Sequence, residues 1–334
     1  MTKPKSEMSK LTSTVIVNSL RAMPYSENKQ SHGIMFHHFE SEVHPWSQGA
    51  LTGEMMASLL EFVGPKRILS AHEWYERSLD GSLEPEHLCL TFDDSLLCQY
   101  DVAWPVMADY GLTGFFYVYS SVFEGGIANL EIYRYFRSVA FESIDSFYSK
   151  FFDTVGDAHN DKFQNAIGKF NPREYLEDYP FFSDNDRLFR HVRDDVLTVP
   201  EYESFMNDLI AQKGFDKFEI RNKLWMTDEI LQTLHKDGNI IGLHSYSHPM
   251  TMERCDVSIQ EEEYTRNFQH LERVLGDKPL TMSHPCNSYN TSTINILENL
   301  GIKLGFRADM AAVSDRHQLE HPRQDHTNIV NMMA

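Results

Sequence analysis

Short apolar segments that alternate with amphipathic ones are the feature that most restricts how this chain of 334 residues can fold. Apolar, β-rich runs predict strands at 33–38, 87–92, 113–119, 239–243, 280–282 and 303–306. Helical spacing predicts helices between them, at 52–63, 97–109, 226–238, 258–275 and 292–300. Because strands alternate with helices, we expect a parallel sheet or barrel with its functional site at the carboxyl ends of the strands.

The middle of the chain does not follow this rhythm. Residues 124–222 are mostly helical in pattern and rich in Phe, Tyr and acidic residues. We therefore expect a helical insertion at 124–222, with its aromatic side chains in a core, within a barrel formed by 1–123 and 223–334. An independent helical domain is the alternative, and a few of the aromatics could instead stack on a sugar or base ring.

The overall charge limits the partners of the chain. Asp and Glu outnumber Lys and Arg, and the formal net charge is −19 at pH 7. An acidic surface of this size repels phosphate backbones and anionic headgroups, so we expect no nucleic acid or membrane-surface partner. A local basic pocket for one phosphate-bearing substrate is still compatible with this charge.

Targeting and redox features favour a cytoplasmic location. Residues Met1–Gln30 lack the apolar stretch of a signal peptide, and no run of about 18 apolar residues predicts an integral membrane segment. The four cysteines form no C-x-x-C pair and suggest no disulfide framework, which fits a reducing compartment.

Polar clusters follow three of the predicted strands. They are Thr91–Asp94, His244–Pro249 and Ser283–Tyr289. One of two adjacent carboxylates can bind a cation while the other stays free as a base. Two histidines and one carboxylate form a common hydrolytic metal site with a position left for water. We expect a divalent metal, Zn²⁺ first, with Co²⁺, Ni²⁺, Mn²⁺ or Fe²⁺ as alternatives.

Two of these clusters carry a family resemblance. Thr91–Asp94 reads T-F-D-D, and His244–Pro249 fits H-[ST]-x-x-H-P. With these motifs the chain resembles the polysaccharide deacetylase (NodB-homology) family of carbohydrate esterases, over about 33–123 and 224–330. The resemblance implies an α/β fold, a distorted (β/α)7 barrel, with the helical insertion outside the shared part.

The resemblance also implies roles for individual residues. Asp93 would be the general base, and Asp94, His244 and His248 would bind the metal. The implied reaction is hydrolysis of an N-acyl group, usually N-acetyl, from an amino sugar. Asp93 would take the proton of the attacking water, and a backbone N–H would help to hold the oxyanion.

The third cluster departs from the family pattern. Many members have R-x-P-[YF] there, whereas Met282–Asn287 contains no arginine. We hypothesise that Arg323, in a segment that resembles the family's L-P-R pattern, supplies the missing guanidinium. For the general acid, His326 is the first choice. The further candidates are His317, His321 and His37.

Other polar residues have structural alternatives. His317 and His321 form a second H-x-x-x-H pair, which we expect to be a surface feature. His284 could bond a loop carbonyl or contact substrate. Cys286 is expected to be a pocket residue whose N–H could serve the oxyanion.

These features predict a metal-dependent deacetylase, which hydrolyses a linear amide bond. Because we expect a cytoplasmic location, the predicted substrate is a small-molecule or lipid-linked amino-sugar precursor of a surface polysaccharide, such as a lipopolysaccharide O-antigen. An amide hydrolase of a non-sugar substrate on the same barrel is one alternative. A catalytically silent sugar-binding or scaffold protein is the other.

Overall fold

The computed structural model describes residues 25, 30–176, 182–313 and 316–333. The expectation of no signal peptide in Met1–Gln30 therefore lies almost entirely outside the described residues. Within the described part, no helix is both long enough and apolar enough to cross a bilayer.

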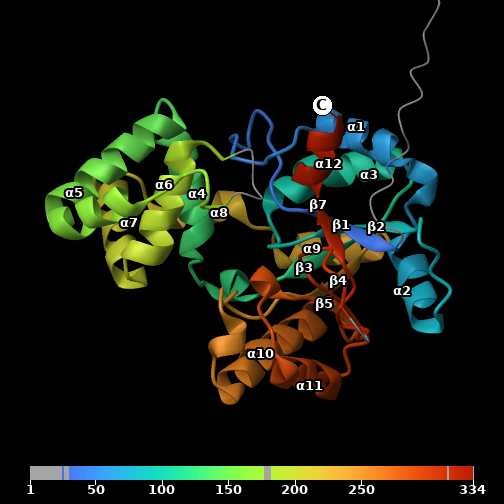
Figure 1. The fold of residues 1–334 in the computed structure, drawn as a ribbon. Helices are drawn as coiled ribbons and strands as arrows, with labels where there is room; N and C mark the ends of the chain where they lie inside the picture. Colours follow the sequence, from blue (N-terminus) through green and yellow to red (C-terminus); the bar gives the residue numbers. More distant parts are fainter. Residues whose placement is uncertain (1–24, 26–29, 177–181, 314–315, 334) are drawn as a thin grey trace, which may run out of the picture.

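A parallel sheet of seven short strands forms the centre of the molecule (Figure 1). The strands are β1 His32–Phe36, β2 Leu88–Phe92, β3 Gly114–Val118, β4 Ile240–Leu243, β5 Thr281–Ser283, β6 Leu304–Phe306 and β7 Arg323–Asp325. Their order is β6-β5-β4-β3-β2-β1-β7, and every pairing is parallel.

The two edges of this sheet approach each other. Phe306 at the end of β6 forms an isolated parallel bridge with His321, two residues before β7. Gly305 permits this approach, because a Cβ atom there would lie 2.7 Å from the Leu319 backbone. The result is a nearly closed (β/α)7 barrel, which confirms the predicted fold class.

Both faces of the strands are buried, as expected for a parallel sheet covered by helices. On β3, Phe115 and Tyr117 pack in one cluster with Cys89 and Phe306. The alternate residues Phe116 and Val118 pack in the larger core cluster instead.

Helices and short turns connect the barrel strands. These helices are α1 Gly53–Val63, α2 Ala71–Asp80, α3 Trp104–Asp109, α9 Asp228–Lys236, α10 Val257–Leu275, α11 Thr291–Leu300 and α12 His326–Met333. Local signals fix several ends: Thr52 caps α1 by accepting from the Met55 N–H, and Thr227 caps α9 in the same way. The polar strand β7 and the helix α2 were not predicted from the sequence.

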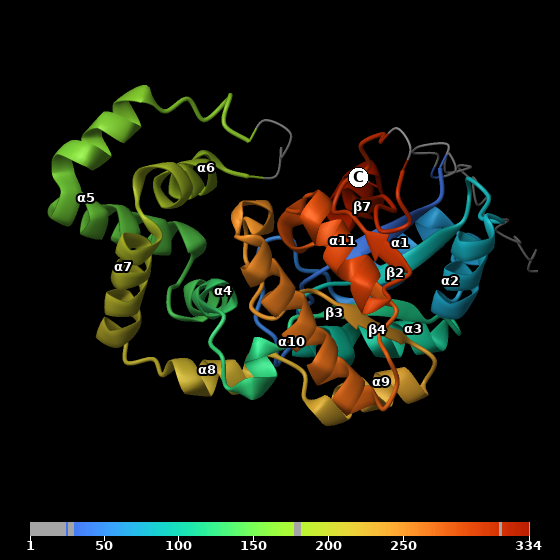
Figure 2. The same ribbon diagram turned by 90° about the horizontal axis from the view of Figure 1, so that it is seen from below.

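The helices between β3 and α9 form a second layer on one side of the barrel (Figures 1 and 2). They are α4 Asn129–Val139, α5 Ile144–Lys169, α6 Asp184–His191, α7 Val199–Gln212 and α8 Lys217–Leu224. Phe136, Phe147 and Phe151 are fully buried, which confirms that much of the aromatic content is core. The exact division of the chain at residues 124 and 222 stays a prediction.

Candidate active site

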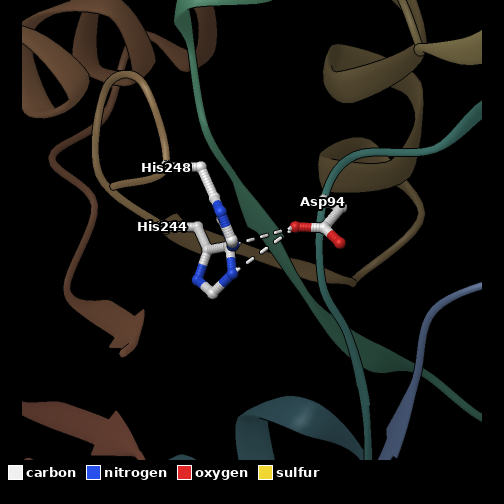
Figure 3. A group of neighbouring side chains, drawn as sticks. All are labelled: Asp94, His244 and His248. Carbon is white, nitrogen blue, oxygen red and sulfur yellow. Dashed lines mark ion pairs between the residues drawn. The ribbon is translucent and has the colours of Figure 1, made fainter. Parts of the chain in front are cut away.

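Asp94, His244 and His248 come together at the carboxyl ends of β2 and β4 (Figure 3). One ligand atom from each lies within 4.8 Å of the others. Asp94 Oδ1 is 3.6 Å from His244 Nε2 and 3.4 Å from His248 Nε2. The sheet order explains the meeting, because only β3 separates the two strands and all three run in parallel.

This cluster fits a divalent metal. Asp94 Oδ1 is buried and has no hydrogen-bond partner, which is costly unless a cation or water satisfies it. Asp94, Ser245 and His248 all have φ near +60° to +75°, a strained backbone region that recurs at functional sites. Two imidazoles and one carboxylate are a common ligand set for Zn²⁺.

The surroundings of His244 favour the form that binds a metal. Burial lowers the pKa of His244 to about 4 against the opposing charge of Asp93, so the ring is neutral at neutral pH. Its Nδ1 lies 2.7 Å from Ser283 Oγ and 2.9 Å from the Ser283 carbonyl oxygen. When Nδ1 donates to these oxygens, Nε2 keeps its lone pair toward Asp94.

Residues on α10 hold the loop that follows β4. Asn267 Oδ1 accepts the His244 N–H at 3.0 Å. Glu263 accepts the N–H groups of Tyr246 and Ser247 at 2.9 Å and 2.7 Å, and the Ser247 hydroxyl at 2.6 Å. The loop is therefore tied to α10 between its two histidines.

Asp93 forms a buried two-point ion pair with Arg323 on β7. Arg323 Nη1 donates to Asp93 Oδ1 and Nη2 to Oδ2, each at 2.7 Å, and the Ser283 hydroxyl donates to Oδ1 at 3.1 Å. Burial alone would raise the pKa of Asp93, but the Arg323 charge, assisted by His244, holds it well below the usual range. The carboxylate next to the metal ligand is thus ionised and fixed in orientation.

The structure separates the candidates for the general acid. His37 Nε2 is 3.9 Å from Asp93 Oδ2, and the side chain is 30% exposed. His326 is buried, with Nδ1 3.0 Å from the Met35 carbonyl oxygen and Nε2 2.8 Å from that of Gly49. Both His326 nitrogens therefore face backbone acceptors, whereas His37 borders Asp93.

The second H-x-x-x-H pair is only in part the surface feature that the sequence predicts, because the His317 side chain is 36% exposed whereas His321 is buried. His321 is 3% exposed, and its Nε2 lies 2.8 Å from Ser78 Oγ. The reason is the bridge to Phe306, which draws this segment into the closing edge of the barrel. His317 contacts Glu298 at 3.2 Å, and neither histidine joins a metal cluster among the described residues.

The third cluster has mixed roles. His284 is fully buried and stacks on Tyr289, and its Nε2 lies 2.9 Å from the Leu319 carbonyl oxygen. It therefore has the structural role of bonding a loop carbonyl. Cys286 is exposed at φ +50°, and its service to an oxyanion stays a prediction. The link from Ser283 to both Asp93 and His244 was missed, because a strand-end serine has no signal of its own.

Comparison with known proteins supports this fold. A sequence model described as "Polysaccharide deacetylase" matches residues 205–305, a range that includes the His244–Pro249 motif but not Asp93. An uncharacterized SPbeta prophage-derived protein, YopQ, of Bacillus subtilis is 32% identical over 91 residues. That match covers 27% of this chain and 18% of YopQ, so it spans less than a fifth of that relative.

Solved structures extend the similarity over about nine-tenths of the chain. The deacetylase PplD of Streptococcus pyogenes, in complex with acetate, has a TM-score of 0.51 at 15% identity, covering 92% of this chain and 98% of PplD. IcaB of Ammonifex degensii has a TM-score of 0.53 at 14% identity, covering 92% and 98%. A de-N-acetylase of Aggregatibacter actinomycetemcomitans has 0.51 at 11% identity, covering 90% and 99%.

Fold and site together define the class of the molecule. It is a nearly closed seven-stranded barrel of the deacetylase type, with an Asp–His–His cluster at the carboxyl ends of its strands. Within it, residues 205–305 match the sequence model described as "Polysaccharide deacetylase".

Proposed function

We propose that this chain is a metal-dependent hydrolase that removes an N-acyl group, N-acetyl first of all, from an amino sugar. The observation that carries the proposal is the pair of adjacent carboxylates in different states. Both oxygens of Asp93 accept hydrogen bonds from Arg323. Asp94 faces His244 and His248, and its Oδ1 has no hydrogen-bond partner among the described residues. This division gives one carboxylate to a cation and leaves the other as a base.

Each residue near the reacting amide has a separate task. Asp94, His244 and His248 would hold a divalent cation, which would supply Lewis-acid chemistry by polarising a carbonyl and lowering the pKa of water. Asp93 accepts the proton of the attacking water, and Arg323 fixes the carboxylate so that it meets that proton in one orientation.

His37 is the general acid that this geometry favours. It borders Asp93 at 3.9 Å and is partly exposed, so it can protonate the leaving amine and exchange its proton with solvent. His37→Ala is expected to lower deacetylation by about 10²-fold, measured as free amine released. With an aryl acetate, whose leaving group needs no protonation, the same variant should lose much less.

His326→Ala is the matched control for the general acid. Its ring stacks on Phe36 and is buried, so the variant should lower the melting temperature more than it lowers the ratio of amide to ester turnover. If His326→Ala changed the ratio of amide to ester turnover more than His37→Ala does, His326 rather than His37 would be the general acid.

For the substrate we propose a carrier-linked amino sugar used to build a surface polysaccharide, such as an O-antigen, in the cytoplasm. All four cysteines are free, which fits a reducing compartment. The fold is similar to that of structures described as a deacetylase and a de-N-acetylase, and this similarity is compatible with acyl removal from nitrogen.

The test uses purified protein loaded with Zn²⁺. We expect it to release free amine and acetate from an N-acetylated nucleotide sugar, to lose this activity with a chelator, and to regain it when Zn²⁺ is restored. Release from a chitin-like polymer alone would refute the substrate class. Retention of full activity with no bound metal would refute the proposed chemistry.

A further inference from the structure

A large cavity lies between the helical layer and the barrel, away from the Asp–His–His cluster. Its volume is about 440 Å³, within the range of small-molecule sites. The helical layer contributes Arg134 and Arg137 from α4 and Arg190 from α6. The barrel side contributes the segment 46–51 and α12.

Two of these arginines have no carboxylate partner among the described residues. Within the described part of the chain, no ion pair joins Arg137 or Arg190 to an acid, and the Nε atoms of both are buried without a hydrogen-bond partner. Aromatic faces contact both: the Arg137 guanidinium lies 4.9 Å from the Phe189 ring centre, and that of Arg190 lies 4.0 Å from the Phe182 ring centre. Arg190 Nη2 also donates to Gln48 Oε1, a neutral acceptor, at 3.4 Å. In a chain of net charge −19, unpaired arginines in a cavity are unusual.

The acidic residues that line this cavity are already engaged with neutral donors. Asp186 accepts from Tyr148, Ser183 and Gln48, and Asp145 accepts from Asn185. Burial, together with the charges of the neighbouring Arg193, Arg137 and Arg134, lowers the pKa of Arg190 to about 10. An anion in the cavity would relieve the repulsion among these guanidinium groups.

A second cavity shares lining residues with this one and reaches His37 at the edge of the candidate active site. It measures about 230 Å³, and its lining includes Arg134, Arg190 and His326, which also line the first cavity. It also includes His37, which lies 3.9 Å from Asp93. A single elongated ligand could therefore reach from the arginines to the reacting centre.

We propose that Arg137 and Arg190, with Arg134 at the passage between the cavities, bind a phosphoryl group of the substrate remote from the scissile amide. This inference rests on the proposed function and deepens it, because it assigns a phosphoryl group to the substrate. Guanidinium groups bind phosphate through paired N–H donors. Trp46, which lines the same cavity and is 50% exposed, offers a ring face beside that phosphoryl group.

The test compares N-acetylglucosamine 1-phosphate with neutral N-acetylglucosamine by calorimetry on the purified protein. The phosphorylated sugar is expected to bind at least tenfold more tightly, and Arg190→Gln should remove this difference, since one charge-assisted pair is worth about that factor. Arg273→Gln, which removes an exposed arginine on α10, is the matched control and should bind as the wild type does.

His248→Ala separates this site from the metal. Binding of the phosphorylated sugar is expected to persist in this variant, whereas deacetylation is lost. If the protein deacetylates no substrate but Arg190 still controls phosphate binding, the proposed function fails and the anion site stands. Binding that depends on His248, or equal affinity for the two sugars, would overturn the anion site.

Inorganic phosphate distinguishes a free anion from a carried one. We expect it to bind more weakly than the sugar phosphate and to compete with it. Equal or tighter binding of inorganic phosphate would overturn the assignment to a substrate. Should Arg190→Gln fail to fold, Arg190→Lys keeps the charge but loses the paired donors, and it is expected to bind the sugar phosphate with intermediate affinity.

Discussion

Asp93→Asn is expected to lower the rate of deacetylation by about 10³-fold while the metal content stays at the wild-type level. The amide has the shape of the carboxylate but cannot accept the proton of the attacking water. The three candidate metal ligands are untouched, because Asp93 lies beside the cluster but Asp94 faces the histidines. The measurement pairs turnover with metal content by mass spectrometry.

Asp109→Asn is the matched control for this substitution. Asp109 ends α3 on the barrel surface, and the change removes the same charge from an exposed position. It should leave turnover and metal content near their wild-type values. If Asp93→Asn kept more than a third of wild-type turnover, Asp93 would not be the base. If it lost the metal, Asp93 rather than Asp94 would be a ligand.

The sequence predicts the barrel well because its signals are local. Strands β2 and β3 are continuous apolar runs, and α1 and α9 begin at threonine caps, so pattern and capping rules locate them. These rules do not predict β7, because Arg323–Asp325 contains no apolar residue. It becomes a strand only through its parallel pairing with β1, a tertiary contact that no local window contains.

In the candidate site, too, local motifs predict some residues, and tertiary contacts alone explain the others. The motifs bring Asp94, His244 and His248 into consideration, and the structure brings their ligand atoms together. The contact between Arg323 and Asp93 agrees with the hypothesis of a substituted guanidinium, although these residues are 230 positions apart. Ser283 and Glu263 were not assigned roles, because a hydroxyl or carboxylate that bonds across the fold has no characteristic spacing.

The helical insertion also contains a feature that local sequence patterns do not predict. Its aromatic residues were expected to form a core, and several do. The sequence pattern predicts no role for its arginines, since arginine in an acidic helical segment normally pairs with a neighbouring acid. Only the packing of α4 and α6 against the barrel leaves Arg137 and Arg190 beside a cavity rather than beside carboxylates.

Arg323→Met is expected to lower the free energy of unfolding by about 3–5 kcal/mol and to reduce turnover. Both members of the pair are buried, so the substitution leaves the Asp93 carboxylate without its counter-charge. Urea unfolding of the metal-free protein measures the stability, and free amine release measures turnover. Metal content after reloading should remain normal, because Arg323 does not contact the three ligands.

The pH dependence of stability should change sign between the two proteins. In the wild type the pKa of Asp93 is lowered, so the pair stabilises the fold above the ordinary Asp pKa of about 3.9 and this contribution is lost as the pH falls through the lowered value. Without Arg323, burial raises the pKa of Asp93, and ionisation then destabilises the fold. The variant should therefore recover part of its stability as the pH is lowered from 8 to about 5.

The double variant Asp93→Asn, Arg323→Met separates stability from catalysis. Removing both charges leaves neither one buried alone, so most of the lost stability should return, as for other buried pairs replaced together. Turnover should stay as low as in Asp93→Asn, because the base is still absent. A loss of less than about 1 kcal/mol in Arg323→Met, within the range of a surface ion pair, would mean that water reaches the pair and that Arg323 does not hold Asp93 in an enclosed site.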